Sequence, residues 1–279
     1  MLAVCTAFFA LALCAHVPVE CAGLDSLTAT DNERRTALDA CANEAHQKPI
    51  DFFLDCVAQL SNRDQRAGGY GDIAANWNSA ELSQESTAAR LLAMINDNAT
   101  SQSARVVALR AMAAIPQEKR PANTAPIEQV TIEINTLPSK MAYDRKEFSI
   151  APNTLVHLIL HNPDALEHNL LIVAPNAMAE IGIAGDRMGQ DPAGKAKEFV
   201  PDSPKVLVVM GLVAPGKSKS AWFIAPTKPA TYPYVCTVPS HWRMMNGKMK
   251  VVAPLVPIVP IAPITPAAPT STTPPAAQP

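Results

Sequence analysis

The chain has 279 residues, of which 17% are charged, and a formal net charge of -2. This length is enough for two ordinary domains, each with a buried core. No basic cluster or acidic block stands out, so the charge pattern gives no reason to expect a nucleic-acid partner.

Residues 1–23, MLAVCTAFFALALCAHVPVECAG, are expected to be a leader segment. They are apolar from Leu2 to Ala15 and then turn to small residues, which suits an export signal better than a membrane-spanning helix. A start assigned inside a longer gene is the alternative. Export predicts a periplasmic, extracellular or cell-envelope location, with membrane or envelope association through the N-terminus. In such an oxidising compartment Cys41 and Cys56 either form a disulfide or stay as two buried thiols.

Residues 25–120 are expected to form a helical domain, because apolar side chains recur there at three- and four-residue spacing. The segments that carry this pattern are 33–46, 49–60, 81–97 and 103–115. The last one, SARVVALRAMAAI, resembles the HEAT-type helical repeats. GGYGDIAANWN, at 68–78, is expected to be a Gly-rich loop, with Tyr70 and Trp77 as packing residues.

After a linker at 121–127 the apolar period changes to two, which is typical of strands. The strand-like segments are VTIEIN, TLVHLILH, HNLLIVA, KVLVVM, SAWFIA, YPYVC and KMKVV. Short strands without long helices between them predict an antiparallel sandwich or barrel over 128–252, with one short helix within 175–204. The fold class is therefore α+β, with the helices and strands in separate domains. Residues 253–279 are Pro-rich and are expected to be extended and disordered, as a spacer, a tether or a tail without function.

One short stretch, YVCTVPSHWRMMNGKM at 234–249, concentrates metal-binding side chains. It contains Cys236, His241 and Met245. One Cys, two His and a weak Met are the ligands of copper in a trigonal electron-transfer site. His168, in NPDALEHNLLIV, is the candidate for the second histidine, because a strand that begins there would hold its side chain at the end of the sandwich.

Three other roles for these residues compete with copper binding. Structural zinc prefers more Cys and His ligands and rarely takes Met. A Cys nucleophile with a His base needs an oxyanion hole and a substrate pocket, and the sequence has no motif for either. A simple buried role for Cys236 is also disfavoured, because soft ligands in this order are improbable by chance. His157 and His161, in contrast, are expected to be solvated surface groups.

The stretch from about 128 to 252 resembles the cupredoxins, in particular the azurins and auracyanins. The matching segments are His168-Asn169, VPDSPKVL at 200–207, the APG turn at 214–216, and YPYVCTVPSHWRMMNGKMKVV at 232–252. The resemblance implies a Greek-key β-sandwich with one type 1 copper and one-electron carrier activity rather than an enzyme. The ligands that it implies are His168, Cys236, His241 and Met245.

The resemblance also implies roles for residues around the ligands. Asn169 and Thr237 match positions that hydrogen-bond the two ligand segments to each other, which would fix the ligands in place. Ser240 stands where most of the family has Gly. If this position needs a positive φ, serine is costly there. Glu167 replaces the Gly of azurins and puts a backbone-carbonyl contact to the copper in doubt. Met244 is one residue out of register and is expected to pack.

Redox proteins are the expected partners, and they would dock near His241 and Trp242, in an apolar patch that the resemblance places at the surface. The helical domain would attach the carrier to a larger assembly. Two other functions compete with electron transfer. One is a scaffold protein with a metal-free cupredoxin module, and the other is copper storage or delivery.

Overall fold

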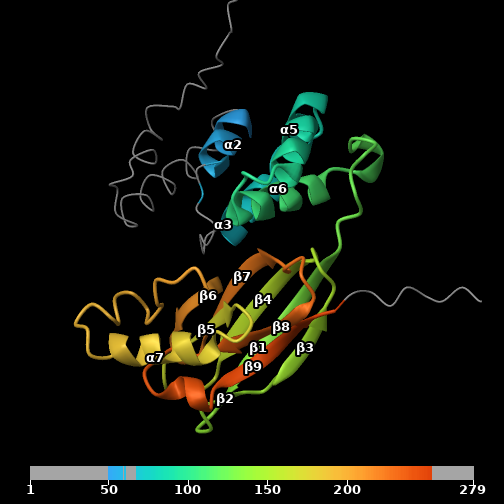
Figure 1. Ribbon diagram of the computed structural model, residues 1–279. Helices are drawn as coiled ribbons and strands as arrows, with labels where there is room; N and C mark the ends of the chain where they lie inside the picture. The colour runs from blue at the N-terminus through green and yellow to red at the C-terminus, as the bar shows by residue number, and fades with distance from the viewer. Residues whose placement is uncertain (1–49, 59, 61–66, 253–279) are drawn as a thin grey trace, which may run out of the picture.

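The computed structural model describes residues 50–58, 60 and 67–252, as a group of helices and a β-sandwich (Figure 1). The expected leader, the helix at 33–46, the Cys41–Cys56 pairing and the Pro-rich tail lie outside the described residues. None of the helices in the described ranges is long and apolar enough to cross a membrane.

The N-terminal part is helical, as its periodicity predicts. The helices are α2 Ile50–Ala58, α3 Ala67–Ala75, α4 Ser79–Leu82, α5 Glu85–Asn96 and α6 Gln102–Ala114, followed by the 3-10 turn η3 Gln117–Lys119. Helix α6 begins after Ser101, whose hydroxyl accepts the backbone N–H of Ala104 at 3.1 Å. The apolar faces meet in one core that includes Leu54, Leu91 and Met112. A HEAT-type repeat in this region stays a prediction.

The expected Gly-rich loop at 68–78 is wrong, because most of it forms helix α3. Glycine disfavours a helix by about 1 kcal/mol relative to alanine, but tertiary packing overrides this preference here. A Cβ atom on Gly71 would lie 2.5 Å from Cδ of Arg110, so the missing side chain lets α3 approach α6. Tyr70 is buried, and the Trp77 ring stacks on Phe53 with centroids 5.4 Å apart, so both are packing residues as expected.

The C-terminal part is a two-layer β-sandwich. Its strands are β1 Gln129–Leu137, β2 Ala142–Tyr143, β3 Glu147–Ile150, β4 Leu155–Asn162, β5 His168–Val173, β6 Val206–Val213, β7 Lys217–Ile224, β8 Ala230–Val235 and β9 Asn246–Val251. One sheet has the order β2-β1-β4-β7 and the other β3-β9-β8-β5-β6. Ile134, Leu158, Leu170 and Tyr234 are fully buried in the core of the sandwich.

The expectation that all strands pair antiparallel is wrong for two pairs. Strand β1 runs parallel to β4, with Gln129 opposite Leu155, and β3 runs parallel to β9, with Glu147 opposite Lys248. The short strands β2 and β3, which the sequence pattern did not reveal, carry the chain from the first sheet to the second. The chain therefore re-enters the first sheet in the direction of β1.

The short helix expected within 175–204 is present as α7, Met178–Met188. It covers the outer face of the five-stranded sheet, where Ile181 packs with Leu171 and Val235 (Figure 1). Every residue of β5 is consequently buried: Leu170 and Ile172 face the sandwich core, and Leu171 and Val173 lie under α7.

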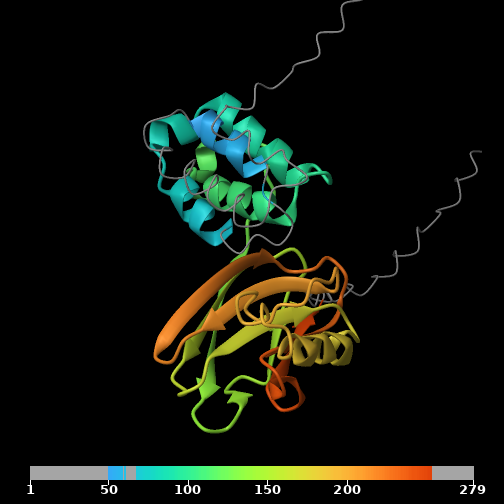
Figure 2. The ribbon, with the colours of Figure 1, turned by 90° about the vertical axis from the view of Figure 1, so that its left-hand side faces the viewer.

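The helices pack against one end of the sandwich, as both views show (Figure 2). Leu155, at the start of β4, belongs to the helical core, and the Arg110 guanidinium lies 3.8 Å from the centre of the Trp222 ring. His157 also stacks on Trp222, with centroids 4.2 Å apart, and is half-buried, so the expectation that it is a solvated surface group is wrong. Strand β4 leads from this contact to Asn162 at the far end of the sandwich.

Candidate metal centre

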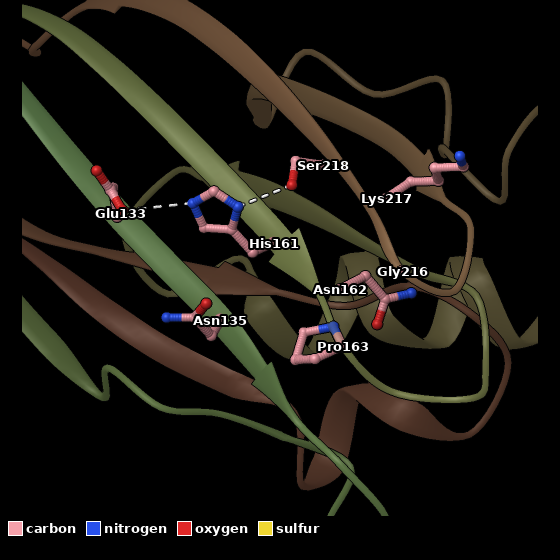
Figure 3. Close-up of a pocket in the computed structure, with 8 residues that line it drawn as sticks. All are labelled: Glu133, Asn135, His161, Asn162, Pro163, Gly216, Lys217 and Ser218. Carbon is pink, nitrogen blue, oxygen red and sulfur yellow. Dashed lines mark hydrogen bonds and ion pairs between the residues drawn. The ribbon is translucent and has the colours of Figure 1, made fainter.

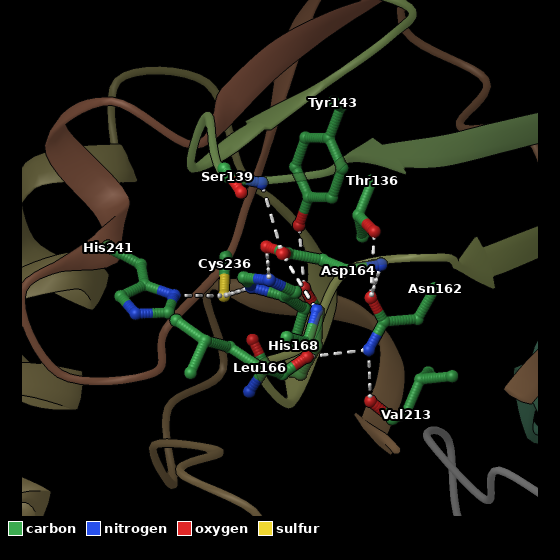
Figure 4. Close-up of polar contacts among 12 residues, drawn as sticks. Thr136, Ser139, Tyr143, Asn162, Asp164, Leu166, His168, Val213, Cys236 and His241 are labelled. Atoms are coloured by element: carbon green, nitrogen blue, oxygen red, sulfur yellow. Dashed lines mark hydrogen bonds and ion pairs between the residues drawn. The ribbon is translucent and has the colours of Figure 1, made fainter. Parts of the chain in front are cut away.

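Three predicted ligands meet at the end of the sandwich opposite the helices. His168 begins β5, Cys236 follows β8, and His241 begins the 3-10 turn η4 His241–Arg243. The Cys236 Sγ lies 3.9 Å from Nδ1 of His168 and 3.6 Å from Nδ1 of His241 (Figure 4). The two histidine ring centroids are 5.1 Å apart, and all three side chains are buried.

These three side chains suit a single metal ion. Their ligand atoms all lie within 4.8 Å of one another, and they form the one such group found among the described residues. Thiolate and imidazole ligands bind transition metals at about 2.0–2.3 Å, so neighbouring ligands of one ion are separated by distances like those seen here. A soft sulfur beside two imidazoles is a donor set that favours copper.

Met245 lies next to this group. It is fully buried in the sandwich core with Cys236, whose backbone N–H donates to the Met245 carbonyl at 3.0 Å. Its role as a ligand stays a prediction. Met244 was expected to pack, but its side chain is 58% exposed, so that expectation is wrong. After η4 the chain turns and continues into β9. Met244 and Met245 lie in this turn, where Met244 is exposed and Met245 is buried.

Burial sets the protonation of the metal-free site. Desolvation raises the pKa of Cys236 to about 12, although the backbone N–H groups of Asn169 and Val238 act in the opposite direction. Desolvation, together with the nearby His168, lowers the pKa of His241. At neutral pH the pocket therefore contains a thiol and a neutral His241, and a metal that binds the thiolate must displace a proton.

Asn169 and Thr237 connect the two ligand segments. The Asn169 Oδ1 accepts the backbone N–H of Thr237 at 2.7 Å, and its Nδ2 donates to Thr237 Oγ1 at 2.9 Å. The backbone carbonyls of Glu198 and Phe199 accept from Asn169 Nδ2 and Thr237 Oγ1. The Tyr143 hydroxyl donates to the Asn169 carbonyl at 2.6 Å. These bonds hold His168 and Cys236, the neighbours of Asn169 and Thr237, at a fixed separation.

Helix α7 holds the loop that carries His241, a role that no local sequence pattern predicts. Gly185 and Gly189 face the loop so closely that a Cβ atom would lie 2.6 Å from the Thr237 carbonyl oxygen and 2.7 Å from Pro239 Cγ. Between them, the Asp186 carboxylate accepts three bonds from the same loop. The donors are the Ser240 backbone N–H at 2.6 Å, the Trp242 indole Nε1–H at 2.8 Å and the Arg243 guanidinium at 3.1 Å.

Ser240 adopts the left-handed conformation, with a φ of 72°. This is the conformation in which serine was expected to be costly relative to glycine. The serine side chain makes no capping bond to η4, and its backbone N–H bond to Asp186 is the contact that compensates.

The loop before His168 is held by its own polar network, shown in Figure 4. Asn162 donates through Nδ2 to the Leu166 and Val213 carbonyls, both at 2.8 Å, and accepts from the Thr136 hydroxyl at 2.7 Å. Asp164, also buried, faces the Nε2 atom of His168 at 2.9 Å. This carboxylate was not among the predicted site residues, although its position four residues before the histidine was a usable signal. Glu167 forms an exposed ion pair with Lys195 at 2.7 Å.

A separate shallow pocket lies on the outward face of the four-stranded sheet (Figure 3). His161 lines it, 2.7 Å from the Ser218 hydroxyl and 3.4 Å from the Glu133 carboxylate. All three side chains come from neighbouring strands, and His161 is partly exposed, as expected for a surface histidine.

Comparison with known proteins identifies the β-sandwich. Residues 130–252 match the family of copper binding proteins described as the plastocyanin/azurin family. The chain is 30% identical to auracyanin-A of Chloroflexus aurantiacus over 124 residues, which is 44% of this chain and 74% of that protein. Auracyanin-B of the same organism is 31% identical over 124 residues, 43% of this chain and 52% of that protein. The crystal structure of dithionite-reduced auracyanin from Roseiflexus castenholzii is 29% identical, with a TM-score of 0.39, over 44% of this chain and 96% of that one.

Proposed function

Because the chain belongs to the plastocyanin/azurin family of copper-binding proteins, we propose that its sandwich carries single electrons between redox partners. The observation that supports this most is the buried group of His168, Cys236 and His241. When bound there, copper supplies a one-electron couple between Cu(II) and Cu(I). Met245 is proposed as the weak fourth ligand, since it is fully buried beside Cys236.

The protein's contribution to electron transfer is a site that changes little between oxidation states. His168 and Cys236 belong to segments fixed by the sheet and by the Asn169–Thr237 bonds, and the His241 loop is fixed by Asp186. Amide donors aimed at the Cys236 sulfur, from Asn169 and Val238, stabilise the thiolate and favour a higher reduction potential. Burial of the ligands also limits the access of water to the site.

We propose that partners dock over the surface next to His241. Met244 and Leu166 are 58% and 50% exposed, and each lies within three residues of a histidine ligand. Small apolar patches of this kind suit the weak, transient interfaces of redox proteins. Trp242 is half-buried against α7, so only part of its surface is available to a partner.

The first test is optical. Cu(II) added to the purified protein should produce an intense thiolate-to-copper band towards the red end of the visible spectrum, and Cys236→Ser should abolish the band. A colourless copper-loaded protein would refute the proposed function.

The adjacent methionines give a matched pair for the fourth ligand. Met245→Leu should alter the band and the reduction potential, whereas Met244→Leu, at an exposed position, should change neither.

A second test concerns docking and needs no identified partner. Electron self-exchange between oxidised and reduced copies should slow when Met244→Glu places a charge on the proposed docking surface. Val252→Glu is the control, because Val252 is 45% exposed but follows the end of β9 that lies away from Met245. Equal slowing by both substitutions would argue against a docking surface at Met244.

Copper storage or delivery predicts rapid exchange of the bound metal, whereas the anchored ligands described above predict slow release in both oxidation states. Competition with a copper chelator distinguishes the two. A metal-free scaffold is disfavoured by the buried group of His168, Cys236 and His241. We further propose that the helices attach the carrier to a larger assembly, since they pack at the end of the sandwich away from the metal centre.

An exported location is proposed as well, and N-terminal sequencing of the mature protein would test it.

A further inference from the structure

Asp164 is a buried carboxylate in direct contact with a predicted metal ligand. Its side chain is 6% exposed, and its Oδ2 lies 2.9 Å from Nε2 of His168, which is fully buried. The other oxygen, Oδ1, accepts the backbone N–H groups of Ser139 at 3.1 Å and Ala165 at 2.8 Å. Both oxygens are therefore occupied, and the carboxylate is held on two sides.

The chemistry of these atoms decides where the His168 proton sits. An ionised carboxylate can only accept hydrogen bonds, so Nε2 must carry the proton and donate it to Asp164. In a neutral imidazole the other nitrogen then has a free lone pair. That nitrogen is Nδ1, which faces the Cys236 sulfur at 3.9 Å.

We propose that Asp164 is a positioning residue for the metal centre. It locks His168 in the tautomer that presents the Nδ1 lone pair to the metal, and it places a negative charge behind that ligand. The tautomer lock concerns the metal-free protein as well. The effect of the charge rests on the proposed function. The negative charge of Asp164 stabilises Cu(II) more than Cu(I), because the ion with the larger charge interacts more strongly with a carboxylate.

The surrounding groups leave that charge in place. The two other donors to Asp164 are neutral backbone amides, which orient the carboxylate without cancelling its charge. The Asn162 side chain fixes the same loop from the other side, by its bonds to Leu166 and Val213. Asp164 is thus aimed at His168 by the loop itself, and the interaction does not depend on a bound metal.

The first measurement uses the full-length, metal-free protein. Nitrogen-15 NMR of the histidine rings should find the neutral His168 ring of the wild type as a single Nε2–H tautomer. Asp164→Ala should give a mixture of tautomers. Thr136→Val is the matched control, because it removes a buried hydrogen bond of the same loop, to Asn162, and touches neither Asp164 nor His168. It should keep the single tautomer.

The second measurement uses the copper-loaded protein. Loss of an outer partner of a ligating histidine typically costs 10- to 100-fold in metal affinity, and we expect this loss for Cu(II) in Asp164→Ala. Each tenfold loss that Cu(I) does not share corresponds to a rise in reduction potential of about 59 mV. Asp164→Asn is a milder variant for the case that the alanine variant does not fold. It lacks the charge in either orientation of its amide, so its potential should also rise.

Two results would overturn the positioning role. One is an unchanged His168 tautomer in Asp164→Ala together with an unchanged potential in Asp164→Asn. The other is an equal change in Thr136→Val, which would mean that any loosening of the loop has the same effect. If the tautomer responds as expected but copper gives no thiolate band, the positioning role stands and the proposed electron-transfer function fails.

Discussion

The Asp186 carboxylate is the most direct point at which to test how the protein holds its metal-binding loop. Asp186 lies on α7, outside the ligand set, and accepts hydrogen bonds from Ser240, Trp242 and Arg243. These residues flank His241 on both sides. We expect Asp186→Ala to destabilise the folded protein and to speed copper release, because the loop loses its anchor on the helix.

The size of the effect follows from the exposure of each donor. A hydrogen bond to a charged group contributes about 1.5–3 kcal/mol when buried. Asp186 is 28% exposed, and Ser240 and Arg243 are exposed, so water can replace part of what their donors lose. The half-buried Trp242 indole is harder to resolvate. With the exposed bonds partly replaced by water and the indole bond lost, Asp186→Ala should lose about 2–3 kcal/mol in the free energy of unfolding.

The effect should also depend on pH. Burial raises the pKa of Asp186, but the bonds from Trp242, Ser240 and Arg243 outweigh it, so the pKa lies below its usual range. A carboxyl with a lowered folded pKa contributes stability that is present above the unfolded value of about 3.9 and is lost as the pH falls through the folded value. The difference between wild type and Asp186→Ala should therefore shrink below about pH 4.

Denaturant unfolding of the metal-free protein and chelator-driven copper release measure the two effects. Glu180→Ala is the control on the same helix, since it removes an exposed ion pair with Lys205 and a negative charge in the first turn, each worth about 0–1 kcal/mol. Trp242→Phe removes a single donor, and its combination with Asp186→Ala should show a coupling of about 1–1.5 kcal/mol. A loss below about 0.5 kcal/mol in Asp186→Ala, with unchanged copper release, would refute the anchoring role.

Three further predictions concern the loop conformation, the thiol and the domain contact. Ser240→Gly should stabilise the protein by about 0.5–1 kcal/mol, because glycine adopts the φ of 72° without steric cost, whereas Ser240→Ala should give no gain. The buried thiol of Cys236, with a pKa of about 12 against a usual 9.0, contributes stability that is full below pH 9 and lost above it. Metal-free wild type should therefore lose about 1.4 kcal/mol per pH unit above pH 9 relative to Cys236→Ala, and parallel curves would contradict the burial of the thiol. Arg110→Met should weaken the contact with Trp222 by about 0.5–2 kcal/mol and increase proteolysis between the helices and the β-sandwich. The copper spectrum should stay unchanged, and a changed spectrum would contradict the separation of this contact from the metal centre.

Several features of the fold could not be predicted from local patterns. Helix α3 contains glycines that locally disfavour a helix, and one of them, Gly71, faces Arg110 where a larger side chain would not fit. Strands β2 and β3 are two and four residues long, too short for a clear period of two. The parallel pairs that they create depend on the path of the chain between sheets, which alternation within a strand does not encode.

Some of the residues around the ligands could be predicted from the sequence, and others could not. Asn169 and Thr237 could be predicted because they match positions, directly after two ligands, that hydrogen-bond the ligand segments in the family that the sequence resembles. Asp186 comes from a helix about fifty residues before the loop that it holds, and nothing in its local sequence connects the two. Met244 was expected to pack because it is apolar, but the geometry of the turn at η4 leaves it exposed.

The sequence by itself determined the chemistry of the centre, because the types and order of the sulfur and nitrogen side chains limit which metal they suit. It also determined the division into a helical and a strand-rich part, since periodicity is a local property of the chain. Only the tertiary structure decided that His168 meets Cys236 and His241, that α7 and Asp164 secure them, and that the helices pack at the opposite end. These are contacts between residues far apart in the chain, and their formation depends on how whole sheets and helices pack.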